Sequence, residues 1–477
     1  MSDLKSSVMH SLKWVMISKI IIQAFRWIST FWVIRLLVPE DYAVVAISDM
    51  IAGYLVALGT LGLGAPLISM RIVTEKLKRQ MLTIGLLMNS ALAAIQYSIA
   101  PYIADYYNNP AVESVLQITA LAYIIQIFTF IPSTILARKM KFKFLSIVET
   151  IAGTTASIVT ILCALNGFGF WSLIIGYLSN EVIKSAFFIF SKEMLFIPSR
   201  PTKRNLAIFV YCLKMSLSEI LFHAKDSIDI ILAGLFLSPK MLGLYNVGLQ
   251  ISSMPLRKIV PPLRKVAFPA LCKVNDQLEK LREYFMKLQR LSFFLTIPIF
   301  WGIASVADLI VPLVLGDTWK NAAMIIMMLC LAMPFRFAEE MLHPVLKSLQ
   351  KGNEIVLCNL GGFIIFGISV WFGIQNGLDG LMYSWLIGLP LIYLFSAIIT
   401  CRNIGASLIE CLWQAVVPMI AGGLMFGVVE IIKFSMLETS LSILMLPVAI
   451  MMGGLVYLAS IYIMKRSLLK EIKDLRK

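Results

Sequence analysis

The segment LKWVMISKIIIQAFRWISTFWVIRLLVPEDYAVVAISDMI, residues 12–51, contains two long apolar runs that are separated by a short polar break at Pro39, Glu40 and Asp41. A helix of about 20 apolar residues is long enough to cross the hydrocarbon core of a bilayer. A proline followed by two acids suits the first turn of a new helix. The segment therefore predicts two membrane-spanning helices joined by a tight, capped turn.

The same pattern continues along all 477 residues, of which 59% are hydrophobic and 14% are charged. Soluble domains carry about 25% charged residues, and disordered chains have low hydrophobicity, so both classes are excluded. We predict an all-α polytopic membrane protein with about 14 transmembrane helices. The predicted spans are 12–36, 43–66, 81–104, 114–137, 144–165, 170–190, 206–236, 243–262, 291–315, 321–345, 355–374, 380–400, 410–432 and 441–464.

The distribution of basic residues predicts the orientation. With both termini on one side, the breaks on that side hold 32 of the 42 Lys and Arg residues, the opposite breaks hold 4, and 6 lie inside spans. By the positive-inside rule, both termini are then cytoplasmic. The basic breaks, which account for the net charge of +15, are expected to contact anionic membrane lipids rather than nucleic acid. The longest break, 263–290, is basic and predicts an interfacial amphipathic helix, with a docking site for a cytosolic partner as the alternative.

Two pairs of similar segments indicate an internal duplication. RLLVPEDYAVVAISDMI (35–51) resembles LFLSPKMLGLYNVGLQI (235–251), and NGFGFW (166–171) resembles NGLDGL (376–381). Both copies begin on the same side of the membrane, so the repeat is parallel, and transporters built this way bind substrate between their halves. We predict an N-lobe at 1–200, a C-lobe at 201–405, and a final segment at 406–477 with two more spans and a cytoplasmic tail.

Charged residues inside spans are costly and usually functional. In the first span Lys19, Gln23 and Arg26 share one helical face, and the 200-residue offset maps them onto Glu219, His223 and Asp226 in the seventh span. Two interpretations stay open. The two helices flank a central cavity and exchange ion pairs as it opens and closes, or the charges form static structural pairs.

Other charged residues favour local, structural roles. Glu181 and Lys184 are three residues apart on one predicted helix and can pair with each other. Arg336 has Glu339 and Glu340 three and four residues later, so it either pairs locally or contacts a ligand. We expect His343, next to Pro344, at a helix end, and Lys433 in a short external break.

The sequence contains no motif for covalent chemistry. It has no phosphate-binding GxxxxGK[ST] loop and no Cys/His metal cluster, and its seven cysteines lie outside the predicted external loops. The longest external break, 105–113, is too short to build a polymerase or ligase site. We therefore expect no enzyme activity, no resident cofactor or metal, and no disulfide framework.

The segments RLLVPEDYAV, LFLSPKMLGLYNVG and above all PPLRKVAFPALCKVNDQLEKLREYFMKL (261–288) resemble the Wzx-type lipid-linked oligosaccharide flippases. These form the polysaccharide transporter family of the multidrug/oligosaccharidyl-lipid/polysaccharide superfamily, and the colanic-acid-exporter branch is the most similar. GDTWK (316–320) and the mid-span Arg336 also fit that branch. The resemblance covers nearly the whole chain, and none of its motifs is catalytic.

This resemblance implies two six-helix lobes in a V shape with two extra C-terminal helices. It implies a bacterial inner-membrane protein that flips undecaprenyl-pyrophosphate-linked oligosaccharides for O-antigen or exopolysaccharide biosynthesis, by alternating access coupled to H⁺ or Na⁺. Polysaccharide polymerase and chain-length machinery are the implied partners. The alternatives are a cation-coupled multidrug antiporter of the same superfamily, which should have an acid-dominated cavity, and, less favoured, a membrane polymerase or ligase.

Lipid II flippases, which are similar in outline, have a cationic central cavity, and this similarity implies a set of site residues. The implied substrate-binding residues are Lys19, Gln23, Arg26, Lys214, Lys225 and Arg336. The candidates for gating or ion coupling are Asp49, Glu219, His223 and Asp226.

Overall fold

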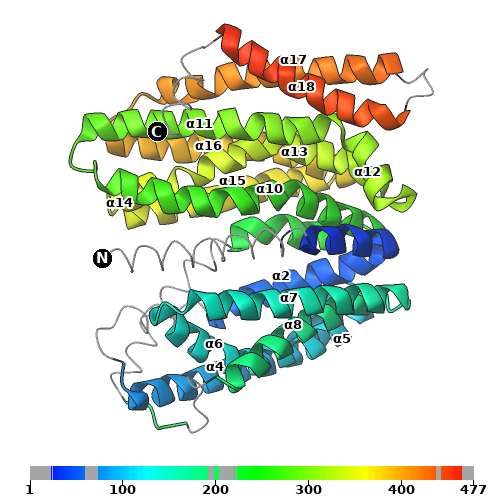
Figure 1. Ribbon diagram of the computed structural model, residues 1–477, viewed down its shortest axis with the longest axis vertical. Coiled ribbons are helices and arrows are strands. Elements are labelled where there is room, and N and C mark those ends of the chain that lie inside the picture. Colours follow the sequence, from blue (N-terminus) through cyan, green and yellow to red (C-terminus); the bar gives the residue numbers. More distant parts are fainter. Residues whose placement is uncertain are drawn as a thin grey trace. The chain divides into compact units, whose positions relative to one another are not determined.

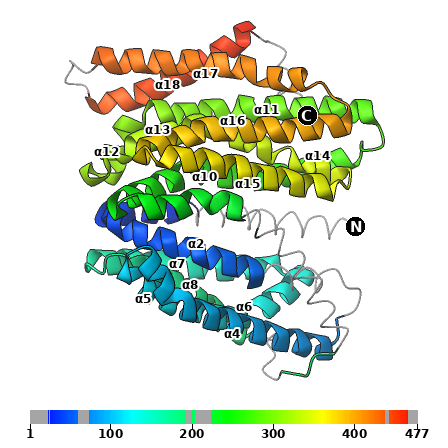
Figure 2. The same ribbon diagram turned by 180° about the vertical axis from the view of Figure 1, so that it is seen from behind.

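The structure, a computed structural model, describes residues 23, 25–59, 73–191, 198–202, 220, 223–436 and 442–464. Within these residues all regular structure is helical and no strand occurs, as Figures 1 and 2 show. Ten segments of the described chain are long and apolar enough to cross a membrane. A helix satisfies its own backbone hydrogen bonds, which the bilayer interior requires. The chain is thus an all-helical multi-pass membrane protein, as predicted.

The chain divides into two compact units, Met1–Gly243 and Leu244–Lys477. In the first unit, residues 25–36 and 223–236 are helical, and α7 packs along α8 while α6 packs on α4 and α8. Its other helices are α2 (Pro39–Gly59), α4 (Glu75–Tyr106), α5 (Pro110–Thr119), α6 (Leu121–Arg138), α7 (Phe142–Leu165) and α8 (Trp171–Ile189). Asp41 confirms the predicted capping turn, because its carboxylate accepts from Val38 N at 3.2 Å and from Phe170 N at 3.0 Å.

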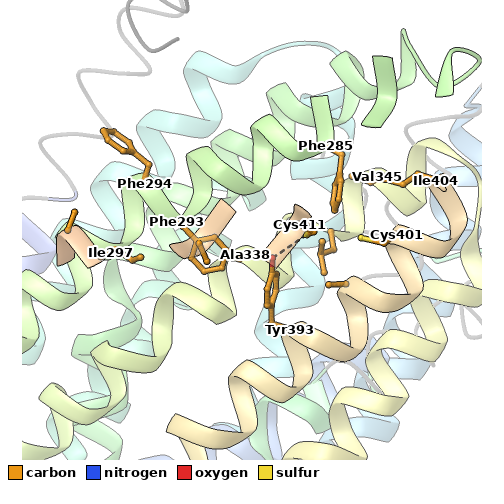
Figure 3. Packing of buried hydrophobic residues seen from close by; sticks show 14 of the residues in the cluster. Phe285, Phe293, Phe294, Ile297, Ala338, Val345, Tyr393, Cys401, Ile404 and Cys411 are labelled. Carbon is orange, nitrogen blue, oxygen red and sulfur yellow. Dashed lines mark hydrogen bonds between the residues drawn. The ribbon is translucent and has the colours of Figure 1, made fainter. Parts of the chain in front are cut away.

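In the second unit, α11 packs on α13 and α17, α15 packs along α16, and α17 along α18. Its core gathers around Phe285, Phe293 and Tyr393 (Figure 3). The helices are α10 (Pro239–Cys272, which begins in the first unit), α11 (Leu278–Ser305), α12 (Ala307–Leu315), η1 (Asp317–Trp319), α13 (Ala322–Glu340), α14 (His343–Ser348), α15 (Gly352–Ile374), α16 (Gly377–Ile404), α17 (Leu408–Met436) and α18 (Ser442–Met464).

The helix breaks of the two units correspond in their backbone conformation. The chain leaves helix before Pro39 and Pro239 in the same way. Met140 and Gln350, which are not glycines, both have a φ of 57° in the turns that end α6 and α14, and Gly167 and Gly377 have φ of 77° and 69°. The turns at Met140 and Gln350 have matching hydrogen bonds, Lys141 N to Leu136 O and Lys351 N to Leu346 O. An offset of 210 residues relates the turns at Met140 and Gln350 and those at Gly167 and Gly377, and an offset of 200 residues relates Pro39 and Pro239. This correspondence supports a duplicated backbone plan.

The ten candidate spans match the third to sixth and the ninth to fourteenth of the predicted spans. About half of the first span and half of the seventh lie outside the described residues. The second and eighth correspond to α2 and α10, which are helical but are not among the ten. The total of fourteen, the lobe limits and the V-shaped arrangement stay predictions.

The prediction of one interfacial helix over 263–290 is wrong. That segment belongs to two long helices, because α10 continues to Cys272 and α11 begins at Leu278. Part of its apolar surface is covered by protein, since Leu271, Leu281 and Phe285 are at most 2% exposed, whereas Val266 and Phe268 are 70% and 40% exposed. The amphipathic pattern therefore reflects helix packing in part.

The crossing of α15 and α16 depends on two glycines. A Cβ at Gly373 would collide with the Gly380 carbonyl oxygen and Ser384 Oγ. We expect Gly373→Ala to destabilise the protein by about 1–3 kcal/mol, the usual cost of overpacking, measured as thermal unfolding in detergent. Gly423→Ala is the control, because no atom lies within 4 Å of its added Cβ. Equal unfolding temperatures for the two variants would contradict the close crossing.

Candidate functional site

The helix at residues 25–36 places Arg26 against α7. A Cβ added to Gly153 would lie 2.6 Å from Arg26 Nη2, so the glycine leaves the space that the guanidinium occupies. One turn further, Ser29 Oγ donates to Ser157 O at 3.5 Å. Arg26 is exposed. Gln23 is half-buried, and Lys19 lies outside the described residues.

The helix at residues 223–236 packs on α2 through His223. Its Nε2 lies 3.4 Å from Met50 O, and its ring meets the Tyr54 ring edge-on at 4.8 Å between centroids. Gly53 permits this approach, since any Cβ there would collide with the imidazole. The sequence mapped His223 onto Gln23, but in the structure it contacts α2.

The remaining predicted residues of this segment are distributed over different faces. Lys225 is 7% exposed, and Asp229, one turn later, is fully buried, whereas Asp226 is half-buried. Lys214 and Glu219 lie outside the described residues. The pairings of Lys19 with Glu219 and of Arg26 with Asp226 therefore stay predictions.

A group of polar side chains lies on α8 and its neighbouring helices in the first unit. Lys184 Nζ pairs with Glu181 Oε1 at 2.9 Å, which confirms the predicted local pair, and Asn180 donates to the same oxygen at 3.1 Å. One turn earlier, Tyr177 Oη accepts from Gln126 Nε2 of α6 at 3.2 Å. Asp49 of α2, which is exposed, lies within electrostatic reach of Tyr177. Three helices thus contribute polar side chains here.

In the second unit, Arg336 of α13 lies over the ring of Trp385 on α16, with Cζ 5.6 Å from the ring centroid. Trp385 Nε1 donates to Tyr245 Oη at 2.9 Å, and both aromatic residues are at most 2% exposed. Arg336 and Gln126 are 210 residues apart, the offset of the repeat, and each contacts an aromatic residue of the next long helix pair. Sequence reasoning did not select Tyr177 or Trp385 as candidate site residues. The available signal was the 210-residue offset between Gln126 and Arg336, which contact these two aromatic residues.

Glu339 and Glu340 follow Arg336, and local pairing with it was one sequence interpretation. In the structure, the Glu340 carboxylate pairs with Arg264 of α10. Glu339 Oε1 lies 3.3 Å from His343 Nε2. The sequence indicated only a helix-end role for His343.

Lys433 was assigned to a short external break, but it lies in α17, largely buried. Its Nζ pairs with Asp308 at 2.9 Å and Glu430 at 2.8 Å, and donates to Ser305 O at 2.9 Å. It borders a cavity of about 590 Å³. These bonds attach α17 to the end of α11 and to α12.

An all-helical membrane bundle with cations and carboxylates held between its helices has the features of a membrane transporter. Residues 33–324 match the model of the polysaccharide biosynthesis protein family. The match covers more than half of the chain, and the chain belongs to this family.

Curated relatives match at low identity. An uncharacterized membrane protein in the cps region of Klebsiella pneumoniae is 23% identical over 481 residues, which cover 99% of this chain and 98% of that protein. The lipopolysaccharide biosynthesis protein WzxC of Escherichia coli (strain K12) is 21% identical over 340 residues, 69% of this chain and 67% of that protein.

Two solved structures share the fold. The lipid II flippase MurJ in an inward closed conformation superposes with a TM-score of 0.75 at 15% identity, over 95% of this chain and 99% of that one. An inward-facing multidrug resistance MATE transporter of the MOP superfamily superposes with a TM-score of 0.64 at 15% identity, over 80% of this chain and 94% of that one.

The Trp385–Tyr245 hydrogen bond generates a stability prediction. Trp385→Phe keeps an aromatic ring but removes the N–H donor, which leaves a buried tyrosine hydroxyl without this partner. We expect a loss of about 1–3 kcal/mol, measured by thermal unfolding in detergent. Trp413→Phe is the matched control, because Trp413 is 61% exposed. An unchanged unfolding temperature for Trp385→Phe would contradict a role for this bond.

Proposed function

We propose that the chain flips undecaprenyl-pyrophosphate-linked oligosaccharide repeat units from the cytoplasmic to the periplasmic leaflet of a bacterial inner membrane. Membership of a polysaccharide biosynthesis family and a fold shared over 95% of the chain with a lipid II flippase support a lipid-linked substrate. The chain is a transporter and not an enzyme. The observation that carries the proposal is the exposed Arg26 guanidinium in its space beside Gly153.

The chemistry of Arg26 suits the proposed substrate. A guanidinium remains charged and presents a planar set of donors that matches phosphate oxygens. Gly153 fixes how closely the guanidinium approaches α7, and the Ser29–Ser157 bond anchors the helix beside it. In the second unit, Arg336 on Trp385 is a further cation for the substrate, and Lys19, Gln23, Lys214 and Lys225 complete the proposed set.

Transport against a lipid gradient requires a coupled driving force, and we assign it to H⁺ or Na⁺. The candidates are Asp49, Glu219, His223 and Asp226. His223 supports this assignment because its contacts with Met50 and Tyr54 of α2 would change with its charge. Cytoplasmic termini, an inner-membrane location and cooperation with polymerase and chain-length machinery belong to the same proposal.

The second candidate function is a cation-coupled multidrug antiporter, which the TM-score of 0.64 with a MATE transporter favours. That likeness covers 80% of the chain, against 95% for the lipid II flippase. A cationic drug would also gain no binding energy from the Arg26 guanidinium, because both carry positive charge. Drug susceptibility of a sensitive host that expresses the chain separates the two functions.

Arg26→Ala should lower surface polysaccharide about 10–100-fold, because a hydrogen bond to a charged group is worth about 1.5–3 kcal/mol. The measurement is complementation of a flippase-null strain with the matching glycan pathway, scoring surface polysaccharide and accumulated lipid-linked intermediate at equal protein level. Lys141→Ala is the control, because Lys141 is an exposed cation in the turn between α6 and α7.

Wild-type export by Arg26→Ala would remove Arg26 from the site and leave the function standing. Failure of the wild-type chain with a confirmed matching glycan, together with gained drug resistance, would favour the antiporter.

Gly153→Ala tests the position of Arg26 separately from its charge. The added Cβ displaces the flexible end of one side chain, so stability should change by less than about 0.5 kcal/mol. Export should still fall several-fold. The variant combined with Arg26→Ala should export no less than Arg26→Ala alone, because residues in contact are not additive. Gly85→Ala, with no atom within 4 Å of the added Cβ, is the control.

A further inference from the structure

A cavity of about 590 Å³ lies in the second unit, where several helices begin or end. Its lining comes from the ends of α11 and α17 and from the starts of α12, α13 and α16. Sites for small ligands typically have volumes of about 300–1,000 Å³. The cavity therefore has the size of a ligand-binding site, and the residues that line it all belong to one compact unit.

The cavity combines buried apolar residues with exposed polar ones. Ala304, Ala307 and Met382 are each 2% exposed. Asp379 and Lys320, which also line the cavity, are exposed. Apolar atoms therefore form its inner wall, and charged groups of both signs stand at its opening. A ligand must satisfy both parts in order to bind well.

The largely buried Lys433 holds two further carboxylates of the lining in place. Its Nζ pairs with Asp308 Oδ2 at 2.9 Å and with Glu430 Oε1 at 2.8 Å, and donates to Ser305 O at 2.9 Å. The side chains of Asp308 and Glu430 are nevertheless 57% and 45% exposed. A carboxylate offers about four lone-pair sites, so both can accept further hydrogen bonds. Groups that are fixed before a ligand arrives bind it at a lower entropic cost.

The charges of the lining narrow the class of ligand. Asp308, Asp379 and Glu430 outnumber the two lysines, Lys320 and Lys433, so a phosphate group would be repelled more than attracted. A lipid chain would remove water from these charges without replacing its hydrogen bonds. In the described part of the chain, no group of three or more His, Cys, Asp or Glu side chains is arranged to hold a metal ion.

We propose that this cavity binds the uncharged sugar residues of an oligosaccharide. A hydroxyl both donates and accepts hydrogen bonds. Sugar hydroxyls can therefore donate to the three carboxylates and accept from the Lys320 ammonium and the Asn321 amide, and hydrogen bonds to charged groups are the stronger ones. The C–H groups of the sugar rings lie against the apolar wall. The assignment of this oligosaccharide to the transported glycan rests on the proposed transport function.

The position of the cavity suits the release side of transport. With cytoplasmic termini, the external breaks of this unit include residues 316–320, 375–379 and 433–440, and the lining comes from these breaks and the helix turns beside them. The cavity then opens on the periplasmic side, where the sugar part of a flipped substrate is delivered. It serves the sugars, whereas Arg26 is assigned to the phosphate.

The test uses methionines of the lining as reporters. Met324, Met327 and Met382 line the cavity, and substitution of each by Leu identifies its signal among those of the 26 methionines. The protein is placed in lipid nanodiscs with ¹³C-labelled methionine methyl groups, and the probe is a neutral repeat-unit oligosaccharide of the matching pathway, released from its lipid carrier. The three signals should shift in a saturable way, whereas Met140, which is 73% exposed in the first unit, should not respond. No saturable shift would overturn the site.

Two variants test whether the ligand uses both signs of charge. Asp379→Asn and Lys320→Gln each remove one exposed charge with little change of size. Each should weaken oligosaccharide binding about 10-fold, because a hydrogen bond to a charged group is lost. Asp276→Asn is the matched control, because Asp276 is exposed in the turn between α10 and α11. Unchanged or tighter binding to either variant would overturn the proposed contacts.

A second probe distinguishes sugars from a lipid headgroup, which can also use both signs of charge. Phosphoethanolamine carries an ammonium and a phosphate group but no sugar ring. We expect it to leave the signals of Met324, Met327 and Met382 unchanged. Saturable shifts with phosphoethanolamine and none with the oligosaccharide would assign the cavity to a lipid headgroup and overturn the proposal.

The link to transport is tested separately by the complementation assay. Asp379→Asn should lower surface polysaccharide several-fold at equal protein level and equal unfolding temperature, and Asp276→Asn should not. Wild-type export by Asp379→Asn would overturn the assignment of the bound sugar to the transported glycan. If the wild-type chain binds the oligosaccharide but exports no matching glycan, the site stands and the proposed function fails. If it exports the glycan while the methionine signals stay unchanged, the proposed function stands and the site fails.

Discussion

The bilayer interior offers no water to backbone N–H and C=O groups, so every interruption of a spanning helix needs a partner from the protein itself. In this chain, polar side chains supply many of those partners. Asp41 accepts from the backbone at two helix starts, Arg264 holds the carbonyl that Pro344 frees, and Arg282 Nε donates to Ile404 O at 2.7 Å at the end of α16. Several charged residues are therefore explained by the chain's own backbone, before any substrate is considered.

The two copies of the repeat share the backbone geometry of their turns but carry different side chains at equivalent positions. The turns at Met140 and Gln350 repeat a strained φ and the same hydrogen bond, and neither residue is a glycine. Such agreement shows that the connection geometry is maintained in both copies. The side chains at equivalent positions differ, as Gln126 on Tyr177 and Arg336 on Trp385 illustrate. Function therefore depends on the side chains that each unit presents and not on the shared fold.

Hydropathy predicted the helices well, because the length and apolar character of a span are properties of the local sequence. The pattern of proline and polar residues also located the turns at Pro39 and Pro239. The three-residue spacing of Glu181 and Lys184 predicted their pair, because both lie on one helix. It failed where the outcome depends on contacts between distant segments. The amphipathic segment 263–290 gave no sign of whether its apolar face would meet lipid or α13 and α16. Likewise, His343 beside a proline has the sequence pattern of a helix end. Only the packed structure brings Arg264 to the Glu340 carbonyl at the end of α13.

The distribution of pairing distinguishes structural charges from functional ones. Glu340 with Arg264, Glu181 with Lys184, and Lys433 between two carboxylates each combine opposite charges, which lowers the cost of burying them. The first and the third of these groups also join two helices, whereas Glu181 and Lys184 both lie on α8. Arg26 differs in being exposed beside a glycine. An accessible cation is what the proposed anionic substrate requires. Because Arg26 takes part in none of these three pairs, a change of its charge leaves the contacts that they make intact.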